Sequence, residues 1–228
     1  MELREVELYG YQGKVTLIDV IPSRIPKGFA TKDAIIATDA MLSTGKSPKD
    51  NIEVYDFITK LFSWKHYSPF EQATLKFQVT APVVVFWQLD RHRTFQYASH
   101  LRRSGRYTEY TESDFYIPTY FDDNTNAELK ELIRTSVATY ERLLAQGIKK
   151  ESARFFLPAW CMMYTEVMTV NLKNLMHFLT LRMAKAAQSE IRAVANAMYE
   201  ITAQEFPYTM KIFKESGVQP VDYDLGEL

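Results

Sequence analysis

Residues 74–107 read TLKFQVTAPVVVFWQLDRHRTFQYASHLRRSGRY, and this stretch decides the fold. Its first seven residues alternate polar and apolar side chains, with the apolar ones at odd-numbered positions, which predicts a half-buried strand. Pro82 then suits the first turn of a helix. The apolar run at residues 83–89 is compatible with either a buried strand or a helix, because periodicity alone does not separate the two.

The second half of this stretch carries a local excess of positive charge. Five of the chain's twelve arginines lie between Arg91 and Arg106, in a window without an acid, although the whole chain has 27 basic and 28 acidic residues. Guanidinium groups held close together repel one another, and such a cluster persists when an anion such as phosphate sits among them. Phe95, Tyr97 and Tyr107 add flat rings for a base or another ring.

Two other interpretations compete with a phosphate pocket. A generic charge run is most often a solvated surface face. A patch for RNA or DNA is the second, but such domains usually carry a large net positive charge spread along a face. The net charge of −1 argues against a nucleic-acid surface. A small phosphorylated ligand needs only a local pocket and fits better.

Length and composition indicate one globular domain spanning residues 1–228. No repeat, low-complexity run or linker-like stretch divides the chain. The start has no basic-then-apolar leader, and no run of eighteen apolar residues occurs, so we expect a cytoplasmic protein without a membrane span. Cys161 is the single cysteine, which excludes an intrachain disulfide and fits a reducing compartment. The four histidines lack zinc-site spacing, so no metal is expected.

The remaining pattern predicts an α+β fold, a mixed sheet with long helices. Residues 14–22 are expected to form a strand, and helices are expected at 31–44, 51–64, 127–145 and about 171–205. In the 127–145 helix the apolar stripe comprises Leu129, Leu132, Ile133, Val137, Tyr140 and Leu144. In the last helix the apolar line comprises Leu172, Leu175, Met176, Leu179, Met183, Ile191, Val194 and Met198. Asn174, Phe178 and Arg182 share a face there, at four-residue steps.

Several segments in order along the chain resemble the flavin-dependent thymidylate synthases. RHR at 91–93, followed by SGRY at 104–107, resembles that family's signature. HYSPFEQ at 66–72 resembles its His-x-Ser/Thr-Pro-Phe-Glu-His segment, and ARFFLP at 153–158 its Ala-Arg-x-x-Leu-Pro element. Residues 171–182 and AQSEIR at 187–192 resemble its long closing helix. The matches span roughly residues 40 to 205 and are specific in combination.

The resemblance implies a homotetramer whose active sites form between subunits. It implies FAD as cofactor, with NADPH and methylenetetrahydrofolate as co-substrates. The implied reaction is reductive methylation at C5 of a uracil nucleotide, dUMP to dTMP. That chemistry needs no nucleophilic cysteine, so Cys161 is interpreted as a small buried apolar residue.

The resemblance also assigns roles to individual residues. Arg182 is expected to face and activate the pyrimidine, with Ser104 as the second catalytic residue, and Arg154 is expected to bind the nucleotide phosphate. The expected nucleotide site comprises Gln88, Arg91, Tyr97, Arg102, Arg103, Ser104, Gly105, Arg106, Arg154 and Arg182. The expected flavin site comprises Ser43, His66, Ser68, Glu71, Arg91, His92, Arg93, Asn171, Lys173 and His177.

One segment departs from the family pattern. The family usually has seven residues between its Arg-His-Arg and its serine, and here ten intervene, Thr94 to Arg103. The usual Asn-Glu before that serine is absent, with Leu101 and Arg102 in its place. We expect residues 97–103 to form part of the nucleotide pocket and to set the choice of sugar. Two alternatives therefore stay open: the same chemistry on UMP, and a non-catalytic nucleotide- or RNA-binding relative.

Overall fold

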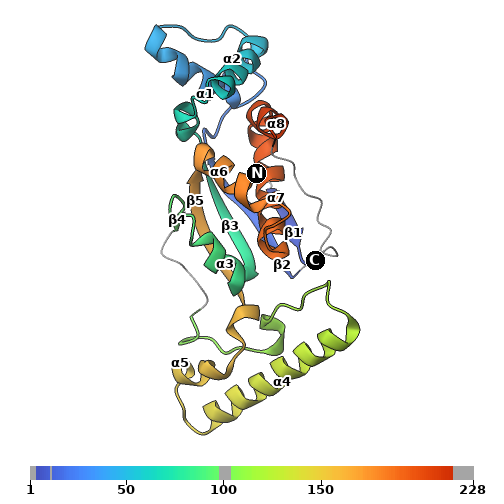
Figure 1. Ribbon diagram of the computed structural model, residues 1–228. Helices are drawn as coiled ribbons and strands as arrows, with labels where there is room; N and C mark the ends of the chain where they lie inside the picture. Colours follow the sequence, from blue (N-terminus) through green and yellow to red (C-terminus); the bar gives the residue numbers. More distant parts are fainter. Residues whose placement is uncertain (1–3, 11, 98–103, 218–228) are drawn as a thin grey trace.

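An antiparallel sheet forms the centre of the computed structural model, which describes residues 4–10, 12–97 and 104–217. Its described strands lie in the order β1-β2-β3-β5-β4 (Figure 1). Their bounds are β1 Arg4–Leu8, β2 Gly13–Ile21, β3 Thr74–Pro82, β4 Gln96–Tyr97 and β5 Met163–Asn171. Every described pair is antiparallel, so the expectation of a mixed sheet is wrong. Neighbouring strands here run in opposite directions, and none is joined by a parallel crossover.

The long inner strands β3 and β5 pair along their whole length, from Thr74 opposite Asn171 to Pro82 opposite Met163. The predicted alternation of β3 is confirmed, because its odd-numbered apolar side chains are fully buried. Strand β5 was not predicted. Its inward face carries Glu166 beside Met168 and Val170, and an acid on the buried face hides the alternating pattern.

The chain passes from β3 directly into a helix, which resolves the ambiguous apolar run. Pro82 is the last residue of β3 and the N-cap of α3, Val83–Leu89. Its fixed backbone angle lets the strand end and the helix begin without a connecting loop. The Val83 amide donates to the main-chain oxygen of Met162 at 2.9 Å, which ties the start of α3 to the start of β5.

Helices cover one face of the sheet and extend from both of its ends. In Figure 1, α6 and α7 lie across the sheet, α1 and α2 lie at one end, and α4 and α5 lie at the other. The α-helices are α1 Asp33–Met41, α2 Asn51–Ser63, α4 Asp123–Ala145, α5 Lys150–Ala153, α6 Leu172–Arg182, α7 Ser189–Glu205 and α8 Pro207–Glu215. The 3₁₀ turns are η1 Leu42–Thr44, η2 Ser68–Gln72, η3 Glu112–Asp114, η4 Arg154–Phe156 and η5 Ala159–Cys161. The predicted strand at 14–22 and the predicted helices at 31–44, 51–64 and 127–145 are confirmed to within a few residues.

The long last helix predicted for residues 171–205 is wrong, because the chain breaks into α6 and α7 at residues 183–188. Arg192 holds this break from inside α7: its Nη1 donates to the main-chain oxygen of Lys185 at 2.9 Å and, at 3.4 Å, to that of Ala187. The apolar line on both sides of the break is buried as expected. Periodicity therefore identified the buried face and missed the turn.

Two apolar clusters stabilise the fold. The larger one joins the sheet to α1, α2, α6, α7 and α8, and the smaller one lies under α4. Ile133, Val137 and Tyr140 of the predicted α4 stripe are buried in the smaller cluster. Leu132 is 55% exposed, so its place in the stripe is wrong.

Helix α6 depends on its N-cap, and we predict a measurable loss of stability when the cap is removed. The Asn171 side-chain oxygen accepts a hydrogen bond from the Asn174 amide at 2.9 Å. Asn171→Ala is expected to lower the free energy of unfolding by about 1 kcal/mol, measured by urea unfolding. Asp50→Ala removes the matching cap of α2 and should give a similar loss. Asn171→Asp keeps an acceptor and should stay near wild type; equal losses in both Asn171 variants would contradict the capping role.

Candidate active site

The C-terminal ends of α3 and α6 meet at a polar cluster around Arg182. Arg182, the last residue of α6, donates from Nε to Nε2 of His92 at 2.9 Å. Its Nη2 donates to the main-chain oxygen of Gln88 at 3.4 Å. The fold thus brings Arg182 and Gln88, which the resemblance assigned to the nucleotide, into contact with His92, which it assigned to the flavin.

His92 is buried among aromatic rings and is neutral at neutral pH. Its ring lies 4.9 Å from that of Phe178 and 6.1 Å from that of Phe95, both edge to face. Burial, followed by electrostatic interaction with Arg182 and with His177, lowers the pKa of His92 from 6.5 to about 4. The neutral imidazole keeps a lone pair on Nε2, and this lone pair accepts the hydrogen bond from Arg182.

Positive charge is concentrated at this cluster. Burial, followed by the charge of Arg91, lowers the pKa of Arg182. The side chains of Arg91 and Arg93 are exposed after the end of α3. Guanidinium groups held close together favour an anionic ligand, whose oxygens accept charge-assisted hydrogen bonds.

The side chain of Gln88 is held by α7. Its Nε2 donates to Oε1 of Gln188 at 2.7 Å and, at 3.4 Å, to the main-chain oxygen of Val84. Gln188 is the N-cap residue of α7. Gln188 received no role in the sequence analysis; its only signal was its place in the AQSEIR motif.

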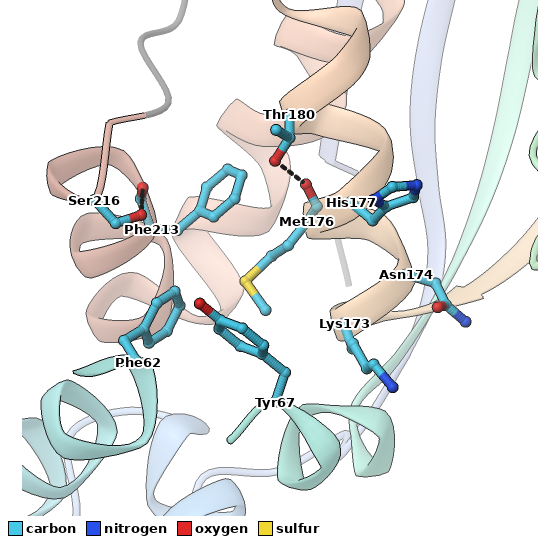
Figure 2. Close-up of a pocket in the computed structure, with 9 residues that line it drawn as sticks. All are labelled: Phe62, Tyr67, Lys173, Asn174, Met176, His177, Thr180, Phe213 and Ser216. Atoms are coloured by element: carbon cyan, nitrogen blue, oxygen red, sulfur yellow. Dashed lines mark hydrogen bonds between the residues drawn. The ribbon is translucent and has the colours of Figure 1, made fainter. Parts of the chain in front are cut away.

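A cavity of about 380 Å³ opens along α6, between Lys173 and Thr180. Figure 2 shows aromatic side chains on one wall and polar side chains of α6 on another. The lining residues are Phe62, Tyr67, Lys173, Asn174, Met176, His177, Thr180, Phe213 and Ser216. Its volume lies in the range of small-molecule sites. Lys173 and His177, two of the residues assigned to the flavin, line it.

Arg91, His92 and Arg93, which were also assigned to the flavin, follow α3 and belong to the Arg182 cluster; they do not line this cavity. The remaining assigned residues lie in η1, in or next to η2, and at the N-cap of α6. Glu71 of η2 forms an ion pair with Lys173 and so links η2 to α6. His66 and Ser68 are exposed on either side of Tyr67, which lines the cavity. Ser43 lies farther along the chain toward the N-terminus, in the exposed turn η1, where its hydroxyl donates to the main-chain oxygen of Ala40 at 3.3 Å. Asn171 is the N-cap of α6.

The predicted nucleotide segment at 104–106 forms a tight turn. Gly105 is buried against Tyr110, and an added Cβ would lie 2.9 Å from that ring, so this position requires glycine. The Arg106 amide donates to Oγ of Ser104 at 3.4 Å, and the Arg106 side chain is exposed. Tyr97 lies in β4, opposite Met168 of β5. Arg102 and Arg103, with the rest of residues 98–103, lie outside the described residues.

Arg154 lies apart from the Arg182 cluster within one chain. It is exposed on η4, which packs against α4 and α5, the helices at the lower end of Figure 1. Among the described residues, no hydrogen bond or ion pair connects Arg154 to Gln88, His92 or Arg182. The residue expected to bind the phosphate and the residue expected at the pyrimidine thus share no such interaction within the described part of the chain.

Cys161 is half-buried rather than fully buried, and it packs beside the smaller apolar cluster. Burial, followed by the charge of Glu190, raises the pKa of its thiol. Within residues 4–10, 12–97 and 104–217, no helix has the length and apolar character needed to cross a membrane. The same residues contain no group of three or more His, Cys, Asp or Glu side chains placed to hold a metal ion.

Comparison with known proteins gives a consistent family. Residues 28–208 match the family model described as thymidylate synthase complementing protein. A flavin-dependent thymidylate synthase of Kosmotoga olearia is 34% identical over 215 residues, covering 83% of this chain and 91% of the relative. One of Thermus thermophilus is 36% identical over 200 residues, covering 80% and 72%.

A solved structure agrees with these matches. The UMP/dUMP methylase PolB from Streptomyces cacaoi, bound with 5-Br dUMP, is 28% identical and superposes with a TM-score of 0.76, covering 92% of this chain and 97% of that one. Fold and site together define a methyltransferase enzyme of the thymidylate-synthase-complementing class. The chain belongs to the flavin-dependent thymidylate synthase family.

The buried, neutral His92 predicts a pH-dependent stability. Its pKa falls from the ordinary value of 6.5, which applies to the unfolded chain, to about 4 in the folded chain, so the unfolded chain binds more protons between these values. Stability should therefore fall as pH drops from about 6.5 toward 4, by at most about 3 kcal/mol from this group. Urea unfolding across that range measures the slope. His92→Gln keeps an acceptor for Arg182 without titrating and should flatten the slope; an unchanged slope would contradict the assignment.

Proposed function

We propose that this enzyme is an FAD-dependent uracil-nucleotide C5 methylase that converts dUMP to dTMP, with methylenetetrahydrofolate and NADPH as co-substrates. The observation that carries the proposal is the arrangement along α6. Its side chains between Lys173 and Thr180 line the 380 Å³ cavity, and its C-terminal residue Arg182 joins Gln88 and His92. A cofactor cavity and an anion-binding cluster thus share one rigid helix, which is what a transfer between a flavin and a nucleotide requires.

The Arg182 guanidinium is proposed to act on the pyrimidine. C5 of uracil becomes nucleophilic when electron density moves through the ring toward a carbonyl oxygen. A fixed cation beside that carbonyl stabilises the developing charge. The hydrogen bonds from Nε to neutral His92 and from Nη2 to the Gln88 carbonyl hold the guanidinium in place, and the remaining N–H groups of Nη1 and Nη2 are proposed to face the substrate.

The remaining nucleotide contacts are proposed from the family resemblance and the local geometry. Arg154 binds the phosphate. The sugar and base are lined by Gln88, Arg91, Tyr97, Arg102, Arg103, Ser104, Gly105 and Arg106. The Gly105–Tyr110 contact supports this proposal, since it holds the main chain on both sides of Gly105 in a fixed turn.

The flavin is proposed to lie along the cavity side of α6. The residues that would hold it are Ser43, His66, Ser68, Glu71, Arg91, His92, Arg93, Asn171, Lys173 and His177. The donor set fits FAD, because aromatic walls suit a ring system and the cationic side chains suit its phosphates. When bound, FAD supplies the hydride that reduces the transferred carbon to a methyl group.

A homotetramer with shared sites is proposed on two observations. Arg154 and Arg182 do not meet within the described part of one chain. In addition, four aromatic side chains lie exposed near Gln88 and Arg154, and exposed apolar patches mark interaction surfaces. They are Trp87, Phe155, Phe156 and Trp160, and the two tryptophan rings lie 5.1 Å apart. This aromatic patch would be covered by a second copy, which would bring its own Arg154 or Arg182 to complete the site.

UMP is the second candidate substrate. The ten residues between Arg93 and Ser104 exceed the usual seven, and the solved relative is called a UMP/dUMP methylase. A 2′-hydroxyl needs room and a polar partner, which residues 97–103 are proposed to supply or to deny. The alternative of a non-catalytic RNA-binding relative loses support, because the family is one of enzymes.

We predict that the purified protein binds FAD and that Arg182→Ala abolishes methylation while FAD stays bound. Losing a charged group that stabilises the developing charge should lower the rate by about a hundredfold, equivalent to about 3 kcal/mol. The measurements are the flavin absorbance spectrum and the formation of methylated product from dUMP and from UMP.

Cys161→Ala is the matched control and should keep its activity, because the proposed chemistry uses no thiol. No flavin spectrum after addition of FAD, or no product from either nucleotide, would remove the proposed function. A fully active Arg182→Ala variant would remove its catalytic role alone.

The shared site predicts complementation between two inactive variants. Arg154→Ala and Arg182→Ala should each be nearly inactive alone. After mixed refolding or co-expression, some interfaces combine an intact Arg154 from one subunit with an intact Arg182 from the other, so part of the wild-type activity should return. Product formation measures the recovery, and light scattering reports the oligomer. If mixed oligomers form and recover no activity, both arginines act within the site of a single subunit and the shared-site proposal is wrong.

A further inference from the structure

Glu190 is a buried acid, and no cation among the described residues neutralises its charge. It is the second residue of α7 and is 1% exposed. No lysine or arginine of the described residues forms an ion pair with it. A buried charge without a counterion lowers the stability of the fold unless its oxygens are fully hydrogen-bonded. The hydrogen-bond partners of Glu190 are therefore the place to look for its role.

Four side chains converge on the carboxylate. Tyr120 and Tyr116 donate to Oε1 at 2.8 Å and 3.2 Å. Gln188 and Ser189 donate to Oε2 at 2.8 Å and 3.0 Å. An ionised carboxylate has about four acceptor positions, so this set fills it. The N-terminus of α7 adds a favourable dipole.

The two tyrosines act as donors in this network. Burial, followed by the hydrogen bond to Glu190 and by its negative charge, raises the pKa of Tyr120 to about 12. Burial and the same negative charge raise the pKa of Tyr116 well above its usual value. Both phenols therefore keep their protons and remain donors, which leaves the carboxylate to accept.

The charge of Glu190 fixes the direction of the hydrogen bonds that lead to Gln88. Because the carboxylate only accepts, Gln188 must turn its NH₂ group toward Glu190. The Oε1 of Gln188 then faces Gln88, which must donate from its own Nε2, at 2.7 Å. The second hydrogen on Nε2 points to the Val84 carbonyl in the same helix. The group left to the site is the amide oxygen of Gln88, an acceptor.

We propose that Glu190 is a positioning residue that, through Gln188, orients Gln88 so that its amide oxygen faces the bound nucleotide. An acceptor at this place pairs with a donor of the ligand, a ring N–H or a sugar hydroxyl, and does not suit a phosphate oxygen. The proposal rests on the nucleotide site of the proposed function. It gives a reason for a buried acid next to that site which the family resemblance left without a role.

The chain of hydrogen bonds from Gln88 through Gln188 to Glu190 is called the relay below. The test disrupts the relay with two variants and measures the steady-state kinetics of the flavin-loaded enzyme with dUMP and with UMP. Glu190→Gln introduces an NH₂ group, so that Gln188 and Gln88 are no longer forced into one orientation. Gln188→Met breaks the relay at an exposed position and leaves the tyrosine contacts in place. Each should raise the nucleotide KM about tenfold, the size expected for one hydrogen bond, with kcat changed much less. The double variant should be no worse than either single one.

Tyr9→Phe is the control, because the Tyr9 hydroxyl donates to the main-chain oxygen of Glu190 at 2.6 Å and leaves the carboxylate relay intact. It should keep the wild-type KM. Three results would overturn the relay: an unchanged KM in Gln188→Met, additive effects in the double variant, or an equal rise of KM in Tyr9→Phe. The proposed function would still stand in each case, provided that the wild-type enzyme turns over. Absence of wild-type turnover with both nucleotides would overturn the proposed function and the relay together.

Discussion

The pairing of β3 with β5 is the constraint on which the rest of the molecule depends. The two strands run in opposite directions, and each continues directly into a helix, β3 into α3 and β5 into α6. The two helices therefore start at opposite ends of the sheet. Because α6 runs back along the sheet, its last residue, Arg182, arrives at Gln88 and His92 near the end of α3. Backbone hydrogen bonds far from the chemistry thus decide which side chains meet at the site.

Helix α6 carries both the cavity-lining side chains and the cation at the centre of the candidate site. Lys173 and Arg182 are nine residues apart, which corresponds to about 14 Å along the helix axis. The cavity lining extends along the helix from Lys173 to Thr180, so the cavity and the cationic cluster at Arg182 lie on one rigid element. The neutral state of His92 is also important, because a protonated imidazole in contact with Arg182 would repel the guanidinium. Burial against Phe178 keeps the imidazole neutral and allows it to hold the guanidinium.

The break between α6 and α7 contributes as much as the helices themselves. A continuous helix would carry Gln188 and Glu190 away along the axis of α6. The turn at residues 183–188 instead returns the chain to α3, so that Gln188 reaches Gln88 and Glu190 reaches the two tyrosines of the 116–120 segment. The buried acid, the tyrosines and Gln88, the glutamine proposed to contact the nucleotide, then form one hydrogen-bonded system. Such a system is sensitive to the polarity of each member, because each amide has one donating and one accepting end.

The sequence by itself determined the elements with strong local patterns and supplied the candidates for the chemistry-bearing residues. Alternation predicted β3, helical spacing predicted α2 and α4, and the motifs resembling one family selected Gln88, His92, Arg154 and Arg182. Only the tertiary structure decided the features that sequence periodicity does not predict. It turned the apolar run after Pro82 into α3, revealed β5 behind a buried Glu166, and divided the last helix at a turn held by Arg192. Each of these depends on a partner distant in sequence. For the same reason the hydrogen bonds of Arg182 to His92, and of Glu190 to Gln88 through Gln188, have no counterpart in local sequence: they exist because the sheet brings α3, α6 and α7 together.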